Sequence, residues 1–235
     1  MAKKKSTAYL TTGELVAGTV FFVIYLLVLP FVTDPFFRWL GRLLGTSFSA
    51  ALKTAVCYYV LFAVTILIFH GFLVRTSRRL AENLGEAVKS LAVGMVALYG
   101  LNELIFRLSY MILGNRTNLN DGTVTVRLDN APHVTLLIVL LLAPFVEEVL
   151  FRGLVFGGLR HKGRALAYTV SCILFALLHV WQFAVEHQDI TYFLLMIQYL
   201  VPGLVLAWAY DHSGTLWTSV AIHSLANALS VWMMR

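Results

Sequence analysis

Charged residues are scarce in this sequence. Asp, Glu, Lys and Arg make up 13% of its 235 residues, whereas 59% are hydrophobic and the mean hydropathy is +0.79. Soluble globular domains carry about 25% charged and roughly 45–50% apolar residues. The shortage excludes a water-soluble enzyme, a disordered protein and a nucleic-acid-binding protein, even though the net charge is +6. The composition instead indicates a protein that crosses the membrane several times.

Cysteine is nearly absent as well. The two cysteines, Cys57 and Cys172, lie within apolar stretches and no C-x-x-C pair is present, which excludes a disulfide framework and a cysteine metal site. The sequence also has no His-Glu-x-x-His zinc motif and no internal repeat. No signal-peptidase site follows its basic N-terminus, so we expect the first apolar segment to be retained as a membrane span.

Apolar runs of about 20 residues, the length that crosses a bilayer, recur along the chain. The candidate spans are 15–33, 54–74, 91–113, 134–156, 165–183, 191–210 and 215–234. We therefore predict an all-α, polytopic transmembrane helical bundle of about seven spans, with six to eight possible. The segment 34–49, rich in aromatic residues and containing two arginines, has the amphipathic pattern of an interfacial helix. The polar stretch 114–133 is predicted to be a loop.

The distribution of positive charge predicts the orientation of the bundle. Lys and Arg residues between the spans are about twice as frequent on the side that holds the N-terminus, and such residues are concentrated in cytoplasmic loops. We therefore expect the N-terminus to be cytoplasmic.

Ionisable residues inside apolar spans are costly and often mark functional sites. In the third span, Glu103 and Arg107 are four residues apart and can form a pair on one helix face. Glu148 and Arg152 in the fourth span have the same spacing. Glu147 is turned about 100° from Glu148, and its neighbours on that face of the helix are apolar, so it needs a partner on another helix, a water molecule or a proton. Glu147 is therefore the best candidate for chemistry.

Histidines in two later spans are candidate partners for Glu147. His179 follows Phe175 by four residues in the fifth span, and His223 precedes Asn227 by four residues in the seventh. At 1.5 Å per residue, Glu147, His179 and His223 each lie within roughly 6 Å of mid-membrane. We expect these three side chains to meet in one buried, polar cavity.

Three short motifs, each on its own predicted span, resemble those of the CPBP family (CAAX proteases and bacteriocin-processing enzymes, also called Abi). In chain order they are Glu147-Glu148-x-x-x-Arg152, Phe175-x-x-x-His179 and His223-x-x-x-Asn227. Each motif alone is a weak signal, but all three in this order are specific. The resemblance implies an intramembrane endopeptidase. We accordingly divide the chain into 1–133, the N-terminal transmembrane helices and polar loop, and 134–235, a CPBP-like catalytic transmembrane core.

The resemblance also implies a role for each motif residue. Glu147 and His179 would activate a water for attack on a peptide carbonyl, and His223 with Asn227 would stabilise the oxyanion. Three further residues would shape the site: Glu148, Arg152 and Phe175. This mechanism needs no cofactor and is the favoured one. Two histidines and a carboxylate are nevertheless sufficient ligands for a catalytic zinc, in which case the ligands would be Glu147, His179 and His223.

The resemblance implies a membrane-associated or lipidated peptide or protein as the substrate. The short chain is most similar to bacterial members of the family, so we expect it in a bacterial cell membrane, surrounded by the lipid bilayer. An alternative is a bacteriocin self-immunity protein that binds a peptide without cutting it. A transporter or proton relay is disfavoured, because the sequence has no inverted repeat. The sequence leaves prenyl recognition, metal dependence and the oligomeric state open.

Overall fold

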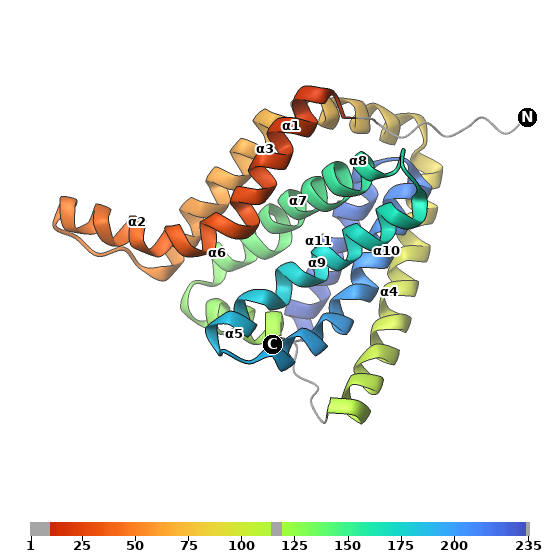
Figure 1. Ribbon diagram of the computed structural model, residues 1–235. Helices are drawn as coiled ribbons and strands as arrows, with labels where there is room; N and C mark the ends of the chain where they lie inside the picture. The colour runs from red at the N-terminus through yellow and green to blue at the C-terminus, as the bar shows by residue number, and fades with distance from the viewer. Residues whose placement is uncertain (1–9, 114–118, 234–235) are drawn as a thin grey trace, which may run out of the picture.

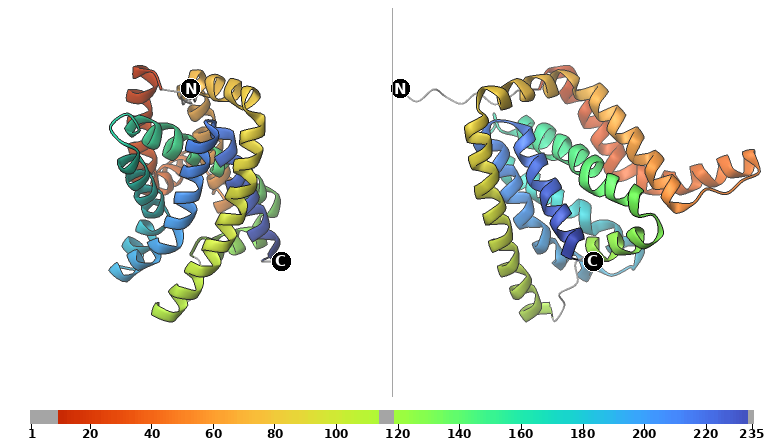
Figure 2. Two further views of the ribbon diagram at one scale, coloured as in Figure 1. Left: turned by 90° about the vertical axis from the view of Figure 1, so that its right-hand side faces the viewer. Right: turned by 180° about the vertical axis from the view of Figure 1, so that it is seen from behind.

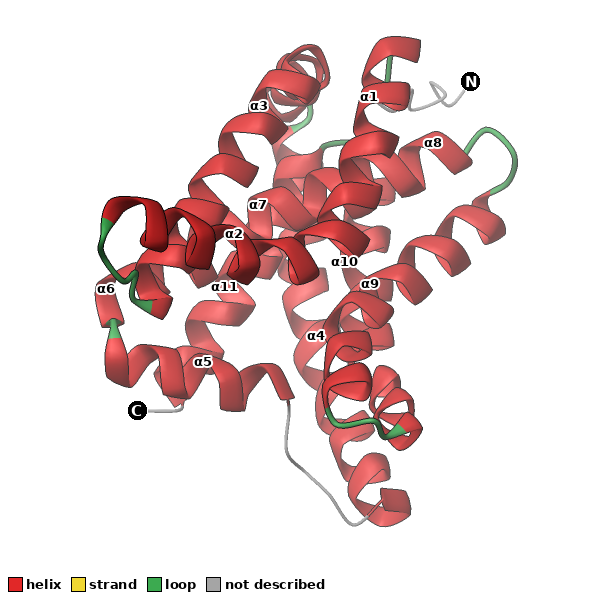
Figure 3. Cartoon of the chain, turned by 60° about the vertical axis from the view of Figure 1, so that its left-hand side comes forward, coloured by secondary structure: helices red, strands yellow, loops and turns green. Residues whose placement is uncertain are grey.

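The computed structural model describes residues 10–113 and 119–233, and in these residues the chain forms helices joined by loops (Figure 3). The predicted all-α class is therefore confirmed. Six helical runs in the described residues are long and apolar enough to cross a membrane: Thr12–Leu44, Ala50–Glu82, Leu84–Leu108, Pro132–Leu159, Arg164–Glu186 and Ile190–Ser213. The chain is thus a polytopic helical bundle, and six spans lie within the expected range.

The first run consists of α1 (Thr12–Val23), η1 (Ile24–Val28) and α2 (Leu29–Leu44). It continues without a break into the segment 34–49, which the sequence analysis treats as separate from the first span. Helix α2 projects away from the bundle (Figure 1), and Phe36, Trp39 and Leu43 on it are exposed. An interfacial position of α2 stays a prediction.

Helix α3 (Ala50–Glu82) is kinked at Phe69, whose φ of −102° and ψ of 15° are not helical. The Glu14 side chain of α1 enters the helix there, because the Phe72 N–H donates to Glu14 Oε1 at 2.5 Å and Arg75 Nη2 lies 2.5 Å from Oε2. A Cβ at Gly71 would lie 3.0 Å from Glu14 Oε1, so glycine permits this approach. A side chain inserted into the backbone ladder explains the kink and ties α1 to α3.

The prediction of a loop over 114–133 is wrong from Leu119 to Asn130 and again at 132–133, which are helical. Helix α5 (Leu119–Asn130) occupies that stretch, after α4 (Leu84–Leu113), and residues 114–118 lie outside the described part of the chain. Val124 and Leu128, four residues apart, pack with Val231. This contact with α11 (Leu216–Met233) gives a polar segment one apolar, buried face, which is enough to hold a helix.

The fourth run is the most buried helix of the bundle. It consists of α6 (Pro132–Leu137), η2 (Ile138–Leu142), α7 (Ala143–Glu148), η3 (Val149–Phe156) and α8 (Gly157–Leu159). Its most apolar window is 67% buried, against 11–39% in the other candidate spans. The segments η2 and η3 have the wider π-helical turn, and η2 ends shortly before Pro144, which has no N–H for a regular helix.

The remaining helices lie mainly on the side of this run opposite α1 (Figure 2). They are α9 (Arg164–Glu186), η4 (Ile190–Met196), α10 (Ile197–Ser213) and α11. Helix α10 packs against α4, α9 and α11. The expected seventh span, 215–234, coincides with α11 in its described residues, and α11 is not among the six candidate spans. Phe22, Phe72, Phe151 and Tyr210 belong to one hydrophobic core, so the N-terminal helices and the C-terminal core pack as one bundle.

Candidate active site

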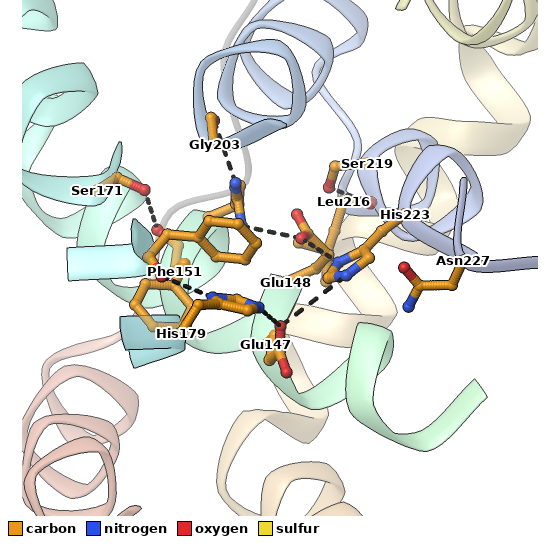
Figure 4. A network of polar contacts seen from close by, with 12 residues as sticks. Glu147, Glu148, Phe151, Ser171, His179, Gly203, Leu216, Ser219, His223 and Asn227 are labelled. Atoms are coloured by element: carbon orange, nitrogen blue, oxygen red, sulfur yellow. Dashed lines mark hydrogen bonds and ion pairs between the residues drawn. The ribbon is translucent and has the colours of Figure 1, made fainter. Parts of the chain in front are cut away.

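Side chains from three helices converge at the C-terminal end of α7 (Figure 4). Helix α7 supplies Glu147 and Glu148, α9 supplies His179, and α11 supplies His223 and Asn227. The expectation that Glu147, His179 and His223 meet is confirmed as geometry. What each residue does chemically stays a proposal.

Glu147 is held opposite both imidazoles. Its Oε2 lies 3.9 Å from His179 Nε2 and 3.9 Å from His223 Nε2. The residue is 7% exposed, and no group in the described part of the chain hydrogen-bonds Oε2. The distances exceed those of direct hydrogen bonds, so Glu147 presents an unpaired carboxylate oxygen to two ring nitrogens.

The ring of His179 is fixed by its own helix. Its Nδ1 lies 2.8 Å from the carbonyl oxygen of Phe175, and because a carbonyl only accepts, Nδ1 carries the hydrogen. With its hydrogen on Nδ1, the neutral form of the ring turns the lone pair of Nε2 toward Glu147. Tyr199 stacks on the imidazole, with ring centroids 4.6 Å apart at an interplanar angle of 21°. Together these contacts set both the tautomer and the orientation of His179.

The ring of His223 is fixed by a buried ion pair. Its Nδ1 lies 2.9 Å from Glu148 Oε1, and the same oxygen accepts from Arg152 Nη1 at 2.9 Å. Arg152 also donates to the carbonyl of Gly203 at 3.1 Å, and its guanidinium lies 4.3 Å from the centre of the Phe175 ring. Both Glu148 and Arg152 are fully buried. The Glu148–Arg152 pair expected from the sequence is confirmed, and it orients His223.

Asn227 lies one helical turn beyond His223 at the wall of the same cavity. Its Nδ2 donates to the backbone carbonyl of Val139 at 2.9 Å, which ties α11 to η2. One of its two amide hydrogens is used by this bond, which leaves the other for a further acceptor in the cavity.

Two cavities meet at Glu147 and His179, which line both. The first has a volume of about 400 Å³ and is also lined by His223, Asn227 and residues of α4 and α10. The second has a volume of about 530 Å³ and lies among α2, α3 and α9. The carboxylate and the imidazole can therefore be reached from two sides of the fourth helical run.

The structure adds three polar residues that the sequence analysis missed. Gln198 and Asn102 line the first cavity, and Arg127 of α5 lines both. Gln198 and Asn102 are uncharged and fall inside predicted spans, where ionisable residues alone were taken as the mark of a functional site. Asking which uncharged polar residues interrupt a span would have found both. Arg127 falls in the stretch wrongly predicted as a loop.

Glu103 and Arg107 form the expected pair on α4, with Arg107 Nε 2.6 Å from Glu103 Oε1. Their side chains are 63% and 69% exposed, respectively, so the ion pair itself is not buried in the bundle. Glu103 also lies at the wall of the first cavity.

A zinc ion would need Glu147, His179 and His223 as its ligands. The donor types suit zinc, because Nε2 of both histidines faces the Glu147 carboxylate and Nδ1 of both is hydrogen-bonded to an oxygen. The distances of 3.9 Å exceed the separation of about 3.3 Å between the ligands of one tetrahedral zinc. In residues 10–113 and 119–233, no three His, Cys, Asp or Glu side chains are grouped to hold a metal ion. The site in this conformation does not fit zinc.

Comparison with known proteins relates the residues around this site to one family. Residues 129–229 match the family model described as type II CAAX prenyl endopeptidase Rce1-like. The chain is also 30% identical over 87 residues to the UPF0177 protein YxdF of Lactococcus lactis subsp. lactis, a match that covers 37% of this chain and 42% of that protein. The chain thus spans less than half of the relative. No solved structure matches it.

Proposed function

Since residues 129–229 form a domain of the Rce1-like type II CAAX prenyl endopeptidase family, a family of peptidases, we propose that the chain is an intramembrane endopeptidase. Its substrate is a membrane-associated or lipidated peptide or protein. The observation that carries the proposal is the position of Glu147 Oε2, buried, unpaired among the described residues and 3.9 Å from two imidazole nitrogens. The proposed membrane is that of a bacterial cell, with the N-terminus in the cytoplasm, as the distribution of basic residues favours.

The attacking group in this proposal is a water molecule held by Glu147 and His179. A water that contacts both Oε2 and the Nε2 lone pair has two proton acceptors directed at it. Glu147 takes the proton as the water attacks the peptide carbonyl, and then delivers it to the leaving amine, as a general base and acid does. His179 holds the second hydrogen of the water and so orients its lone pair. No metal ion takes part in this sequence of steps.

The oxyanion is stabilised by His223 and Asn227 in the same proposal. The Nδ1–H of His223 is committed to the Glu148 carboxylate, so only the protonated ring can donate from Nε2. Asn227 supplies its second amide hydrogen. Donors of this kind in a site that excludes water lower the barrier by about 3–4 kcal/mol each.

Cleavage of a fluorogenic peptide library that includes lipidated members tests the proposal. The purified protein is assayed in detergent beside the Glu147→Gln variant, which removes the base and keeps the shape. Loss of general-base catalysis costs about 10²- to 10⁴-fold in rate. Glu103→Gln is the matched control, because Glu103 lies at the same cavity on an exposed ion pair. Its rate is expected to stay within about twofold.

Each part of the proposal has a result that would refute it. Equal activity of wild type and Glu147→Gln would remove Glu147 from the mechanism. Loss of wild-type activity with a strong chelator, restored by added zinc, would overturn the metal-free mechanism. If no peptide is cleaved and Glu147→Gln still protects cells against a bacteriocin, the chain acts as an immunity protein by binding alone.

A further inference from the structure

Gln198 is the most unusual polar residue of the first cavity. It is 2% exposed, it lies at the start of α10, and it lines the cavity that contains Glu147, His179 and His223. Neither Oε1 nor Nε2 of its amide has a hydrogen-bond partner in the described part of the chain. An unpaired buried amide costs about 1–3 kcal/mol, so a group kept there without a partner indicates that a ligand supplies one.

The backbone at this point also lacks one of the usual helical donors. Pro202, four residues after Gln198, lies inside α10 and lines the same cavity. Proline has no N–H, so the carbonyl of Gln198 has no donor at its normal helical position. On the facing helix α4, Asn102 lines this cavity too, and no described group bonds its Oδ1. Two facing helices thus contribute to one cavity wall the amide donor of Gln198 and several acceptors.

We propose that Gln198 and Asn102 form a subsite that holds the main chain of an extended peptide beside Glu147. The side-chain amide of Gln198 accepts from a peptide N–H and donates to a peptide carbonyl, which is the pairing that two peptide groups make in a sheet. The Oδ1 of Asn102 accepts a second N–H of the peptide. Main-chain pairing fixes the scissile bond without selecting side chains. This inference rests on the proposed endopeptidase function.

The decisive experiment pairs a protein variant with modified peptides. The best-cleaved peptide of the fluorogenic library is remade with one N-methylated backbone amide at a time, which removes one N–H. Each derivative is assayed with wild type and with Gln198→Met, which keeps the volume of the side chain and removes its polar atoms. At one position we expect N-methylation to lower wild-type kcat/KM about fivefold or more and to change Gln198→Met by less than about twofold.

A matched control separates this role from general damage. Gln182 is an exposed glutamine that lines the second cavity, and Gln182→Met is expected to keep the wild-type response at every N-methylated position. If every derivative loses the same fraction of activity in wild type and in Gln198→Met, the subsite does not contact the peptide main chain and the inference is wrong.

A binding measurement distinguishes failure of the inference from failure of the proposed function. Labelled, unmodified peptides are titrated into Glu147→Gln and into Glu147→Gln with Gln198→Met, and fluorescence anisotropy is followed. Binding that is weaker by about fivefold or more in the double variant supports the subsite even if wild type cleaves nothing. Equal binding, or no binding by either protein, overturns the subsite.

Discussion

Replacing Glu148 by leucine is expected to destabilise the protein strongly, because Arg152 is then buried without its counter-charge. The two side chains are fully buried, and Arg152 Nη1 lies 2.9 Å from Glu148 Oε1. Removing one partner of such a pair costs about 3–5 kcal/mol. At about 2–4 °C per kcal/mol for a chain of this size, the melting temperature should fall by about 6–20 °C.

The double variant Glu148→Leu with Arg152→Met should recover most of this loss. A buried ion pair replaced as a whole by apolar residues of similar volume is often neutral or stabilising, because neither charge is left behind. The Arg152→Met variant alone should lose less than Glu148→Leu, since His223 Nδ1 still lies 2.9 Å from Glu148 Oε1 and leaves the carboxylate one hydrogen-bond partner. Thermal unfolding of the detergent-purified proteins, followed by tryptophan fluorescence, gives all three values.

Glu103 and Arg107 provide the control, because they have the same residue types and spacing on an exposed helix face. Their contact is shorter, at 2.6 Å, but the side chains are more than 60% exposed, and exposed pairs contribute about 0–1 kcal/mol. Glu103→Leu should lower the melting temperature by less than about 4 °C. If it lowers the temperature as much as Glu148→Leu does, or if the double variant is no more stable than Glu148→Leu, the reasoning from burial is refuted.

Two further predictions concern the contact of α1 with its neighbours. Glu14→Ala should lower the free energy of unfolding by about 1–3 kcal/mol, because the buried N–H of Phe72 loses its acceptor. Glu14→Gln keeps an acceptor oxygen and should cost less. Equal melting temperatures for the two variants would contradict this reasoning. Gly18→Ala should cost about 1–3 kcal/mol by overpacking, because the added Cβ would lie 2.5 Å from the buried Phe69 ring. Gly100→Ala on α4 is the control. A Cβ there meets nothing within 4 Å, so this variant should be neutral or stabilising. Unfolding of both glycine variants checks the order, and a less stable Gly100→Ala would contradict it.

Much of the candidate site could be predicted because its residues lie on helices with a known period. A spacing of four residues is enough to pair Glu148 with Arg152, and the same period separates Glu147 from that pair. The apolar setting of Glu147 then requires a partner from another helix. The positions of His179 and His223 near the middle of their spans make them the partners in reach, and the structure places both beside it.

Other features depend on contacts between distant segments and were missed. The polar composition of α5 predicts a loop, but Val124 and Leu128 become a buried face only when Val231 of α11 lies against them. The kink of α3 arises because Glu14, far away in sequence, takes the Phe72 N–H. Gln198 becomes a candidate binding residue only because it lines a cavity and no described group hydrogen-bonds its amide.

The class of protein, the approximate spans and the ion pairs within a helix can all be read from the amino-acid sequence. Each of these three follows from composition or from the local period of one helix, and none depends on how helices pack. Only the packed bundle shows that Glu147 is equally distant from two imidazoles, that Glu148 orients His223, and that Asn227 donates a hydrogen bond to η2. These contacts join helices separated by long stretches of chain, and the packing of side chains between those helices sets the distances.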